Sequence, residues 1–455
     1  MQILVGVVLF AVLLAMPVSD AFARSLRSQI IQKGLDPDSP IAKAIRPLGN
    51  VVASQVANQL PTLSSSAGYT FEYDESLGVF ARVAKTFGSL FVERAVTVGR
   101  GKLNVAGAYS YVRFDSLDGH DIGKLRSRVE QAFDPGSQQE IFSGLRTSNT
   151  ADFRTAAGLA DFADFVAVEE DLKIEAQVWD FSLTYGVLHD LDVNVELPVI
   201  RTYQRSSQTD TTPDPRCVAA DVGPCQDLAD AYDDLLGPGA LNDDGFLETD
   251  IGSRRGTKLG IGDLKLRGKY VFLKDPARLA TIFTLALPTG DANDYQGTGD
   301  TRLQFDLVAS GEVTRWLELH GQAGVELNAD DVDRSQARYA FGFTAQPFDL
   351  VAASVDFIGR SEFNALTSIP GTGRLPKVQD GEYVEDPLSG AASYSGRGVF
   401  FDVGRNDILD LSFGVKIGVG TTSVLSLNMI VPLNDDGLRA DFVPTIGFES
   451  LFSLL

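Results

Sequence analysis

The chain has 455 residues and a formal net charge of −22 at pH 7. This acidic balance argues against a nucleic-acid partner, because nucleic acids bind basic surfaces. No internal window of about 18 or more apolar residues occurs, which excludes a helical membrane protein. The hydrophobic content of 44% fits a chain in which only alternate residues face an apolar environment.

The N-terminus has the pattern of a signal peptide. Ile3–Val18 is an apolar run of suitable length, and Ala21-Phe22-Ala23 follows it as an A-x-A cleavage site. No Lys or Arg precedes the apolar run, so a short buried helix is the alternative interpretation. We predict a signal peptide over residues 1–23, cleavage near Ala23 and export of the chain.

Residues 24–100 form a predicted N-terminal segment that begins in the periplasm. From Ser25 to Leu60 the apolar residues are spaced unevenly between Pro and Gly breaks, in a loosely helical pattern. We expect the segment to be loose or to pack at the mouth of the domain that follows; a plug inside that domain is the alternative. Tyr69–Tyr73 and Leu90–Val98 are predicted as short lead-in strands.

Residues 101–455 show the alternation of β-strands. Between Leu317 and Leu327 the apolar residues fall on odd positions, while Glu318, His320 and Glu326 fall on even ones. A period of two places the two sets on opposite faces of a strand. These segments are about twice the usual strand length, as expected of strands that cross a membrane. The predicted strands are Leu103–Asp115, Leu172–Val187, Leu191–Tyr203, Leu259–Leu273, Leu279–Pro288, Thr301–Val313, Trp316–Asn328, Gln336–Gln346, Leu350–Phe363, Asp407–Val419, Ser423–Leu433 and Leu438–Phe448.

The connections between these strands alternate in length. Those after even-numbered strands are very short, such as His189-Asp190 and Gly420-Thr421. Several of those after odd-numbered strands are long, at residues 116–171, 204–258 and 364–406. Short periplasmic turns and long extracellular loops are typical of outer-membrane barrels. We therefore predict an all-β fold, a transmembrane antiparallel up-and-down β-barrel of about 12 strands.

Aromatic residues support the same fold, because they fall on the apolar positions of the strands, several of them near strand ends. A lipid-facing surface places aromatic residues there. A large soluble β-sandwich is the alternative, although it would not require strands of this length. The residues are Trp179, Tyr185, Tyr270, Phe272, Phe283, Trp316, Tyr339, Phe341, Phe343, Phe357 and Phe413.

Charged residues on the opposite face are expected to point into the barrel lumen. Such residues either line a hydrated constriction and set its selectivity, or pair with one another to fill the lumen and support the wall. Both interpretations remain open for each residue. The candidates are Asp263, Lys265, Arg267, Lys269, Glu318, His320, Glu326, Asp356 and Arg360.

Cys217 and Cys225 are the two cysteines, and both lie in the long acidic connection over 204–258. In an oxidising compartment this spacing favours a disulfide over two free thiols, and two cysteines are too few for a zinc site. Acidic loop clusters miss the calcium-binding spacing of an EF-hand. We predict no metal site and no cofactor.

An enzymatic function is disfavoured. The sequence has three histidines and no G-x-S-x-G nucleophile elbow, so no catalytic constellation can be assembled from it. We predict that the protein is not an enzyme.

Several short motifs resemble a known family. They are ELPVIRT at Glu196–Thr202, GIGDLKLRGKY at Gly260–Tyr270, LALPTGD at Leu285–Asp291, GTGDT at Gly297–Thr301 and PLNDDGLR at Pro432–Arg439. In order and spacing they resemble the bacterial outer-membrane proteins grouped as "MetA-pathway of phenol degradation", or SphA-like transporters. The resemblance implies a porin-like barrel that passes hydrophobic or aromatic compounds, and it supplies no catalytic motif.

One departure concerns the C-terminus. Such barrels commonly end on an aromatic residue that the barrel-assembly machinery reads, whereas this chain ends Phe452-Ser453-Leu454-Leu455. Together the features predict a channel in the bacterial outer membrane for passive uptake or export of small hydrophobic or aromatic molecules. Its predicted partners are outer-membrane lipid and lipopolysaccharide, the assembly machinery and the solute. A non-transporting surface scaffold or adhesin with a plugged barrel is the alternative, and a barrel hydrolase is a weaker one.

Overall fold

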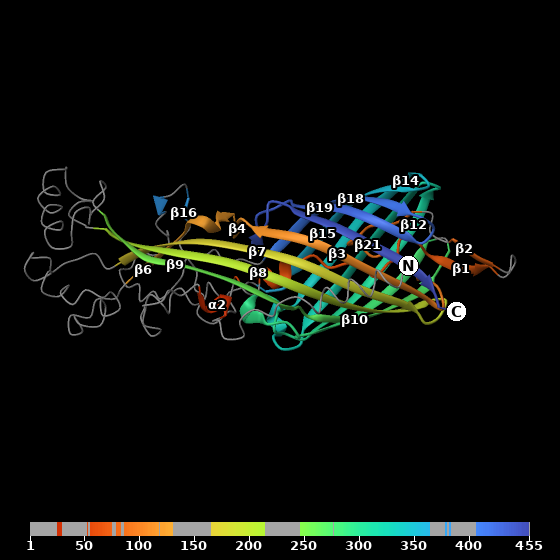
Figure 1. Cartoon of the computed structure of the whole chain (residues 1–455), viewed down its shortest axis with the longest axis horizontal. Helices are drawn as coiled ribbons and strands as arrows, with labels where there is room; N and C mark the ends of the chain where they lie inside the picture. Colours follow the sequence, from red (N-terminus) through yellow and green to blue (C-terminus); the bar gives the residue numbers. More distant parts are fainter. Residues whose placement is uncertain are drawn as a thin grey trace, which may run out of the picture.

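Twelve long antiparallel strands form a closed β-barrel in a computed structural model of the chain (Figure 1). Each strand pairs with its neighbours in the chain, and the first closes against the last. The strands are β3 Lys102–Phe114, β7 Phe165–Gly186, β8 Leu191–Pro213, β10 Leu264–Leu273, β11 Arg278–Leu287, β12 Arg302–Thr314, β13 Leu317–Asn328, β14 Gln336–Phe348, β15 Val351–Glu362, β18 Asp407–Val419, β19 Ser423–Pro432 and β21 Val443–Ser453.

The structure describes residues 25–29, 52, 55–74, 79–82, 86–117, 119–130, 165–213, 246–275, 277–364, 378–379, 382–383 and 406–454. Cys217 and Cys225 lie outside these residues, so their predicted disulfide stays a prediction. Short elements complete the described part: α2 Leu26–Gln29, β1 Phe71–Asp74, β2 Val79–Arg82, β4 Ser116–Leu117, β5 His120–Asp121, η1 Ile122–Lys124, β6 Leu125–Glu130, β9 Phe246–Ile261, η2 Ala292–Asp294, η3 Val332–Arg334, β16 Val378–Gln379, β17 Glu382–Tyr383 and β20 Leu438–Arg439.

The predicted alternation of short and long connections is confirmed. β12 passes to β13 through Arg315 and Trp316 alone, whereas β15 and β18 are separated by residues 363–406. The short turns lie at one end of the barrel and the long connections at the other (Figure 1). The two ends are called here the short-turn end and the long-connection end.

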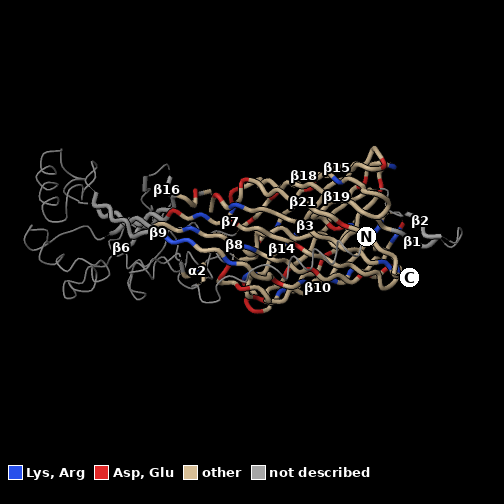
Figure 2. Tube along the Cα trace, viewed as in Figure 1, with Lys and Arg blue, Asp and Glu red and all other residues tan. Residues whose placement is uncertain are grey.

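Several strand boundaries differ from the prediction. β7 and β8 run far beyond the barrel and pair there with β6 and β9 (Figure 1). This extension carries charged residues such as Arg205 and Arg255 (Figure 2). The predicted strand Leu259–Leu273 is divided at Gly262 and Asp263, because β8 pairs with β9 above this point and with β10 below it.

The last predicted strand was placed too early. Leu438–Arg439 forms β20, which pairs with β4, and the wall strand β21 begins only at Val443. A tight turn with Gly437 at a positive φ of 71° separates β19 from β20. Leu438 itself is fully buried and packs in the lumen rather than facing outward.

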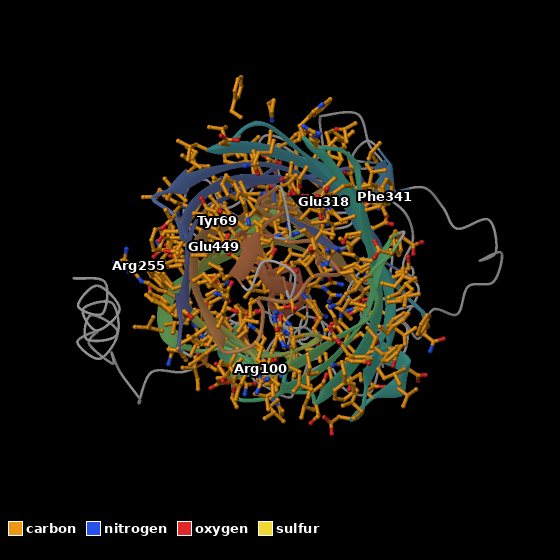
Figure 3. All side chains as sticks on the ribbon, turned by 90° about the vertical axis from the view of Figure 1, so that its right-hand side faces the viewer. Tyr69, Arg100, Arg255, Glu318, Phe341 and Glu449 are labelled. Atoms are coloured by element: carbon orange, nitrogen blue, oxygen red, sulfur yellow. The ribbon has the colours of Figure 1, made fainter. Side chains whose placement is uncertain are left out.

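The outer surface of the barrel is apolar. Phe283 and Phe341 are 50% and 60% exposed, as predicted for the apolar face of their strands, and Trp316 in the turn between β12 and β13 is 49% exposed. Figure 3 looks along the barrel and shows Phe341 on the outside of the ring. On the opposite face, polar side chains such as Thr344 and Asp356 are fully buried in the lumen. Separately, no helix among the described residues is long and apolar enough to cross a membrane.

A segment that precedes the barrel in sequence lies inside it. Residues 55–70 and 86–98, called here the inner segment, contact lumen-facing side chains along much of the barrel, and Tyr69 is seen within the ring of strands in Figure 3. The hairpin β1–β2 joins the two parts and projects from the short-turn end (Figure 1). The segment is therefore not confined to the barrel mouth, and Leu90–Val98 forms no strand.

The described residues that precede β3 reach both ends of the lumen. The backbone N–H of Leu26 in α2 donates to Asp294 Oδ1 at 2.9 Å, in the connection between β11 and β12 at the long-connection end. At the other end, the N–H of Val98 donates to Asp192 Oδ2 at 2.9 Å, next to the turn that begins β8. The expectation that this segment starts on the short-turn side is thus not met for its described residues.

Candidate functional site

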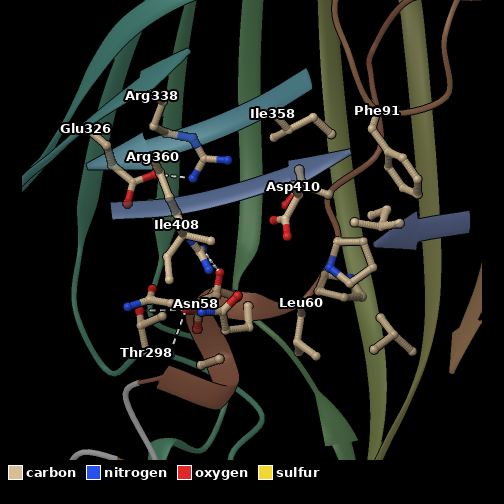
Figure 4. A pocket seen from close by; sticks show the side chains of 18 of the residues that line it. Asn58, Leu60, Phe91, Thr298, Glu326, Arg338, Ile358, Arg360, Ile408 and Asp410 are labelled. Atoms are coloured by element: carbon tan, nitrogen blue, oxygen red, sulfur yellow. Dashed lines mark hydrogen bonds and ion pairs between the residues drawn. The ribbon is translucent and has the colours of Figure 1, made fainter. Parts of the chain in front are cut away.

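A cavity of about 200 Å³ lies in the lumen beside the inner segment, in the half of the barrel nearer the long-connection end, and Figure 4 shows its lining. Residues 57–62 and Phe91 of the inner segment form part of its lining, and strands from around the whole barrel supply the rest. The alternation of each strand directs one set of side chains into this space. The two sides of the cavity differ in chemistry.

One side is charged and comes from β12, β13, β14, β15 and β18. Glu326 on β13 accepts hydrogen bonds from Arg302 and Arg338, each at 3.1 Å. Asp410 on β18 pairs with Arg439 Nη2 at 2.5 Å. Three guanidinium groups therefore share two carboxylates.

Arg360 on β15 is the fourth guanidinium group on this side. It stands directly opposite Arg338 in the ladder between β14 and β15, and its Nη1 donates to the backbone carbonyl of Asn58. Among the described residues it makes no ion pair within 4.0 Å. Figure 4 shows Arg360 and Arg338 on the same side of the cavity as Glu326.

The other side of the cavity is apolar. It is built mainly by β19, β21, β3, β7 and β8, which follow β18 around the wall, and it begins at Ile408 on β18, which pairs with Arg360 in the β15–β18 ladder. Its side chains are Val112, Phe114, Val178, Pro198, Ile200, Ile408, Ile430, Pro432 and Val443, with Leu60 and Phe91 of the inner segment. The cavity is therefore amphipathic, with an apolar wall that faces a cationic one.

Lys265 and Arg267 on β10 line the cavity at its edge nearer the short-turn end. Both pair with Glu196 on β8, at 3.0 and 2.6 Å respectively. Each also holds the inner segment, since Lys265 Nζ donates to Thr62 Oγ1 at 2.8 Å and Arg267 Nη1 to the Leu63 carbonyl at 2.9 Å.

On the short-turn side of the cavity, Lys269 on β10 forms an ion pair with Glu93 of the inner segment. The Lys269 Nζ lies 2.7 Å from Glu93 Oε2, and the N–H of Ser65 donates to Glu93 Oε1 at 2.6 Å. Burial alone would raise the pKa of Glu93, which belongs to the inner segment and not to a barrel strand. The charges of Lys269 and Arg267, together with these hydrogen bonds, outweigh burial and lower that pKa to about 2.

Two further clusters hold the inner segment near the short-turn end. Glu318 accepts hydrogen bonds from the fully buried Arg94, at 3.3 Å, and from Thr86. Arg94 Nη2 also donates to the Ala67 carbonyl at 2.6 Å, which ties both parts of the segment together.

The second of these clusters joins β13 and β15. His320 Nε2 lies 2.6 Å from Asp356 Oδ1, and Ser89 Oγ donates to Asp356 Oδ2 at 2.6 Å. All three side chains are buried. The histidine and the carboxylate thus position the inner segment and do not face the cavity.

The structure divides the nine predicted lumen residues into two groups. Asp263, Lys265, Arg267, Glu326 and Arg360 line the cavity, whereas Lys269, Glu318, His320 and Asp356 contact the inner segment below it. Asp263 contributes a fixed carboxylate, which accepts from the N–H of Gly290 at 3.1 Å and from that of Thr298 at 2.9 Å.

Five charged residues that line the cavity are not among the nine candidates. They are Asp180, Arg302, Arg338, Asp410 and Arg439. The signal that identifies them is strand parity: Arg338, for example, alternates with Tyr339 and Phe341 and shares the face of Gln336 and Ala340.

No family model matches the chain, and no curated protein sequence matches it. The resemblance to the phenol-degradation family therefore stays a prediction. Among solved structures, a COG4313 outer membrane channel from Pseudomonas putida F1 is 10% identical, with a TM-score of 0.41, over 79% of this chain and 98% of that one. The translocator domain of the autotransporter NalP from Neisseria meningitidis is 9% identical, with a TM-score of 0.34, over 78% and 89%.

A third solved structure is the CymD monoaromatic hydrocarbon channel, which is 10% identical with a TM-score of 0.31, over 78% of this chain and 89% of that one. At these identities and TM-scores, none of the three bears on the solute or the mechanism of this chain.

Proposed function

We propose that the protein is an outer-membrane channel for small hydrophobic or aromatic molecules, which cross passively through the lumen. The amphipathic cavity is the observation that carries this proposal. A barrel that serves only as a scaffold has no use for an apolar-walled space in its lumen, whereas binding sites for small organic molecules are concave and mostly apolar, with a few polar groups.

The outer surface supports a membrane location. A belt of apolar side chains such as Phe283, Phe305 and Phe341 is half exposed or more, and water would be a poor solvent for it. The signal peptide over residues 1–23 would deliver the chain across the inner membrane, with the long connections outside the cell.

The inner segment acts as the gate in this proposal. Part of it lies between the cavity and the short-turn end, where its buried hydrogen bonds to Lys269, Glu318 and Asp356 fix it against the wall. Passage of a solute then requires part of this segment to move. The ion pairs also favour the second candidate function, a surface scaffold whose barrel stays plugged.

A cross-link distinguishes the two functions. The N–H of Ala95 donates to Ser310 Oγ at 3.2 Å, and both residues are buried and small. Ala95→Cys with Ser310→Cys, in a Cys217→Ser and Cys225→Ser background, allows the segment to be joined to β12. We would record conductance in a planar bilayer before and after reduction.

A gated channel should open in discrete steps when reduced and lose most of these openings when oxidised. The background without the two new cysteines should conduct equally under both conditions. A folded barrel, judged by heat-modifiable gel migration, that conducts under neither condition would reject the channel in favour of the plugged scaffold.

A further inference from the structure

We propose that the cavity binds an organic acid with a single ring, whose carboxylate contacts Arg360 and whose ring lies on the apolar wall. This inference rests on the proposed function, because the acid would be the solute. It narrows that function from hydrophobic or aromatic molecules in general to those that carry one negative charge.

The first argument is the charge of the polar wall. Arg302 and Arg338 share Glu326, and Arg439 uses Asp410. Arg360 donates a hydrogen bond to the backbone carbonyl of Asn58. This carbonyl carries no net charge. Among the described residues, the four guanidinium groups of this wall therefore outnumber its two carboxylates, Glu326 and Asp410. A bound anion would supply a further negative charge.

The second argument is the pairing of two arginines across neighbouring strands. Arg338 and Arg360 stand directly opposite each other in the β14–β15 ladder. Side chains in this arrangement have Cβ atoms only about 5 Å apart, and like charges there repel. A carboxylate between the two groups would turn this repulsion into two attractions, since guanidinium groups bind carboxylates through parallel N–H bonds.

The third argument is the shape of the rest of the ligand. On β8, β19 and β21 the cavity presents Ile200, Ile430 and Val443, whose side chains offer no hydrogen bond and favour an apolar group. The volume of about 200 Å³ is smaller than the roughly 300–1,000 Å³ of sites for drug-sized ligands. One ring with one carboxylate fits this limit, whereas a long acyl chain does not.

The carboxylates in the cavity do not oppose this assignment. Glu326 and Asp410 are each committed to arginine partners, and Asp263 is held by the backbone of Gly290 and Thr298. Asp180 stands on β7, on the apolar side of the lumen, near Lys265 and Arg267 rather than beside Arg360.

The test uses the full mature chain in detergent and two probes of nearly equal shape, 4-fluorobenzoate and 4-fluorobenzyl alcohol. Binding of each is measured by 19F NMR titration at constant ionic strength. The acid should bind at least ten-fold more tightly than the alcohol. Arg360→Gln should weaken binding of the acid by roughly 10-fold or more, as expected for loss of a charge-assisted hydrogen bond, and should change binding of the alcohol less than about two-fold.

The matched control is Arg334→Gln. Arg334 is also an arginine with carboxylate neighbours, Asp300 and Asp331, but it lies at the long-connection end and outside the cavity. Binding of both probes should be unchanged. Arg338→Gln provides a second cavity variant if Arg360→Gln fails to give a heat-modifiable barrel, and it should weaken binding of the acid in the same direction.

Three outcomes would overturn the inference: equal affinity for the two probes, preference for the acid that survives both cavity variants, or no binding of either probe. These outcomes are separate from failure of the channel itself. A barrel that conducts in discrete steps yet does not prefer the acid keeps the proposed function and loses this inference.

Discussion

Lys269 and Glu93 form a buried ion pair between the wall and the inner segment, 2.7 Å apart, with side chains 2% and 10% exposed. Removing one partner of such a pair leaves a charge without compensation. Lys269→Met should therefore lower the free energy of unfolding by about 3–5 kcal/mol. The measurement is urea unfolding in detergent, followed by tryptophan fluorescence.

Lys274→Met is the matched control. Lys274 pairs with Asp190 at the same 2.7 Å distance, but their side chains are 36% and 42% exposed. Exposed pairs contribute about 0–1 kcal/mol, so this variant should unfold almost as the parent does. Equal losses in the two variants would mean that burial does not set the strength of the Lys269 pair.

The pKa of Glu93 predicts how stability depends on pH. Its pKa is about 2 in the folded barrel and 4.5 when exposed, so the unfolded chain binds the proton more tightly. The stabilisation is fully present above pH 4.5 and is lost as the pH falls toward 2. Between these values the parent should lose more unfolding free energy than Glu93→Gln; parallel pH profiles would contradict the assignment.

At the scale of elements, the inner segment depends on one glycine. Gly88 has a φ of 67°, and a Cβ built on it would lie 2.2 Å from Arg94 Nε. Gly88→Ala should displace Arg94 from Glu318 and loosen the segment, which would raise the open probability in a planar bilayer. Gly420→Ala is the control, because Gly420 has a φ of 70° but no atom within 4 Å of its Cβ position. An equal effect of both variants would show that φ strain alone is responsible.

The wall strands were predictable because an apolar outer face and a polar lumen impose a period of two. The stretch from Gln204 to Pro213 of β8 is polar on both faces, so it has no apolar alternation in the sequence and was not predicted as strand. The break at Gly262 has a signal in the sequence, because the outward-facing apolar residues change from odd positions in β9, as at Ile261, to even positions in β10, as at Leu266.

The candidate site was predictable only in part, and for a similar reason. Parity placed Arg267, Lys269 and Glu318 in the lumen, but it does not say what lies opposite them. Lys269 meets Glu93 across 176 residues of sequence, and Arg94 meets Glu318 across 224. Contacts of this kind follow from the path of the inner segment, which has no periodic pattern of its own.

At the scale of the whole molecule, the apolar outer surface predicts how the cost of a charged substitution depends on its depth in the membrane. Phe341 lies in the middle of β14 and is 60% exposed, while Phe348 ends the same strand at the short turn and is 70% exposed. Phe341→Arg should cost about 2–4 kcal/mol and Phe348→Arg about 0–1 kcal/mol, if the belt faces lipid. Reversible unfolding from lipid vesicles measures both, and equal costs would argue against a membrane position.

The path of the chain through the lumen has a topological consequence. Leu26 lies at the long-connection end and Val98 at the short-turn end, and β3 follows Val98 closely and closes against β21. Once that seam is paired, the enclosed chain can leave only by sliding lengthwise. A folded domain wider than the lumen, fused ahead of Leu26, could not pass through it. Such a domain therefore stays at the end of the barrel that it occupies when β3 pairs with β21. It cannot move to the other end unless this pairing breaks.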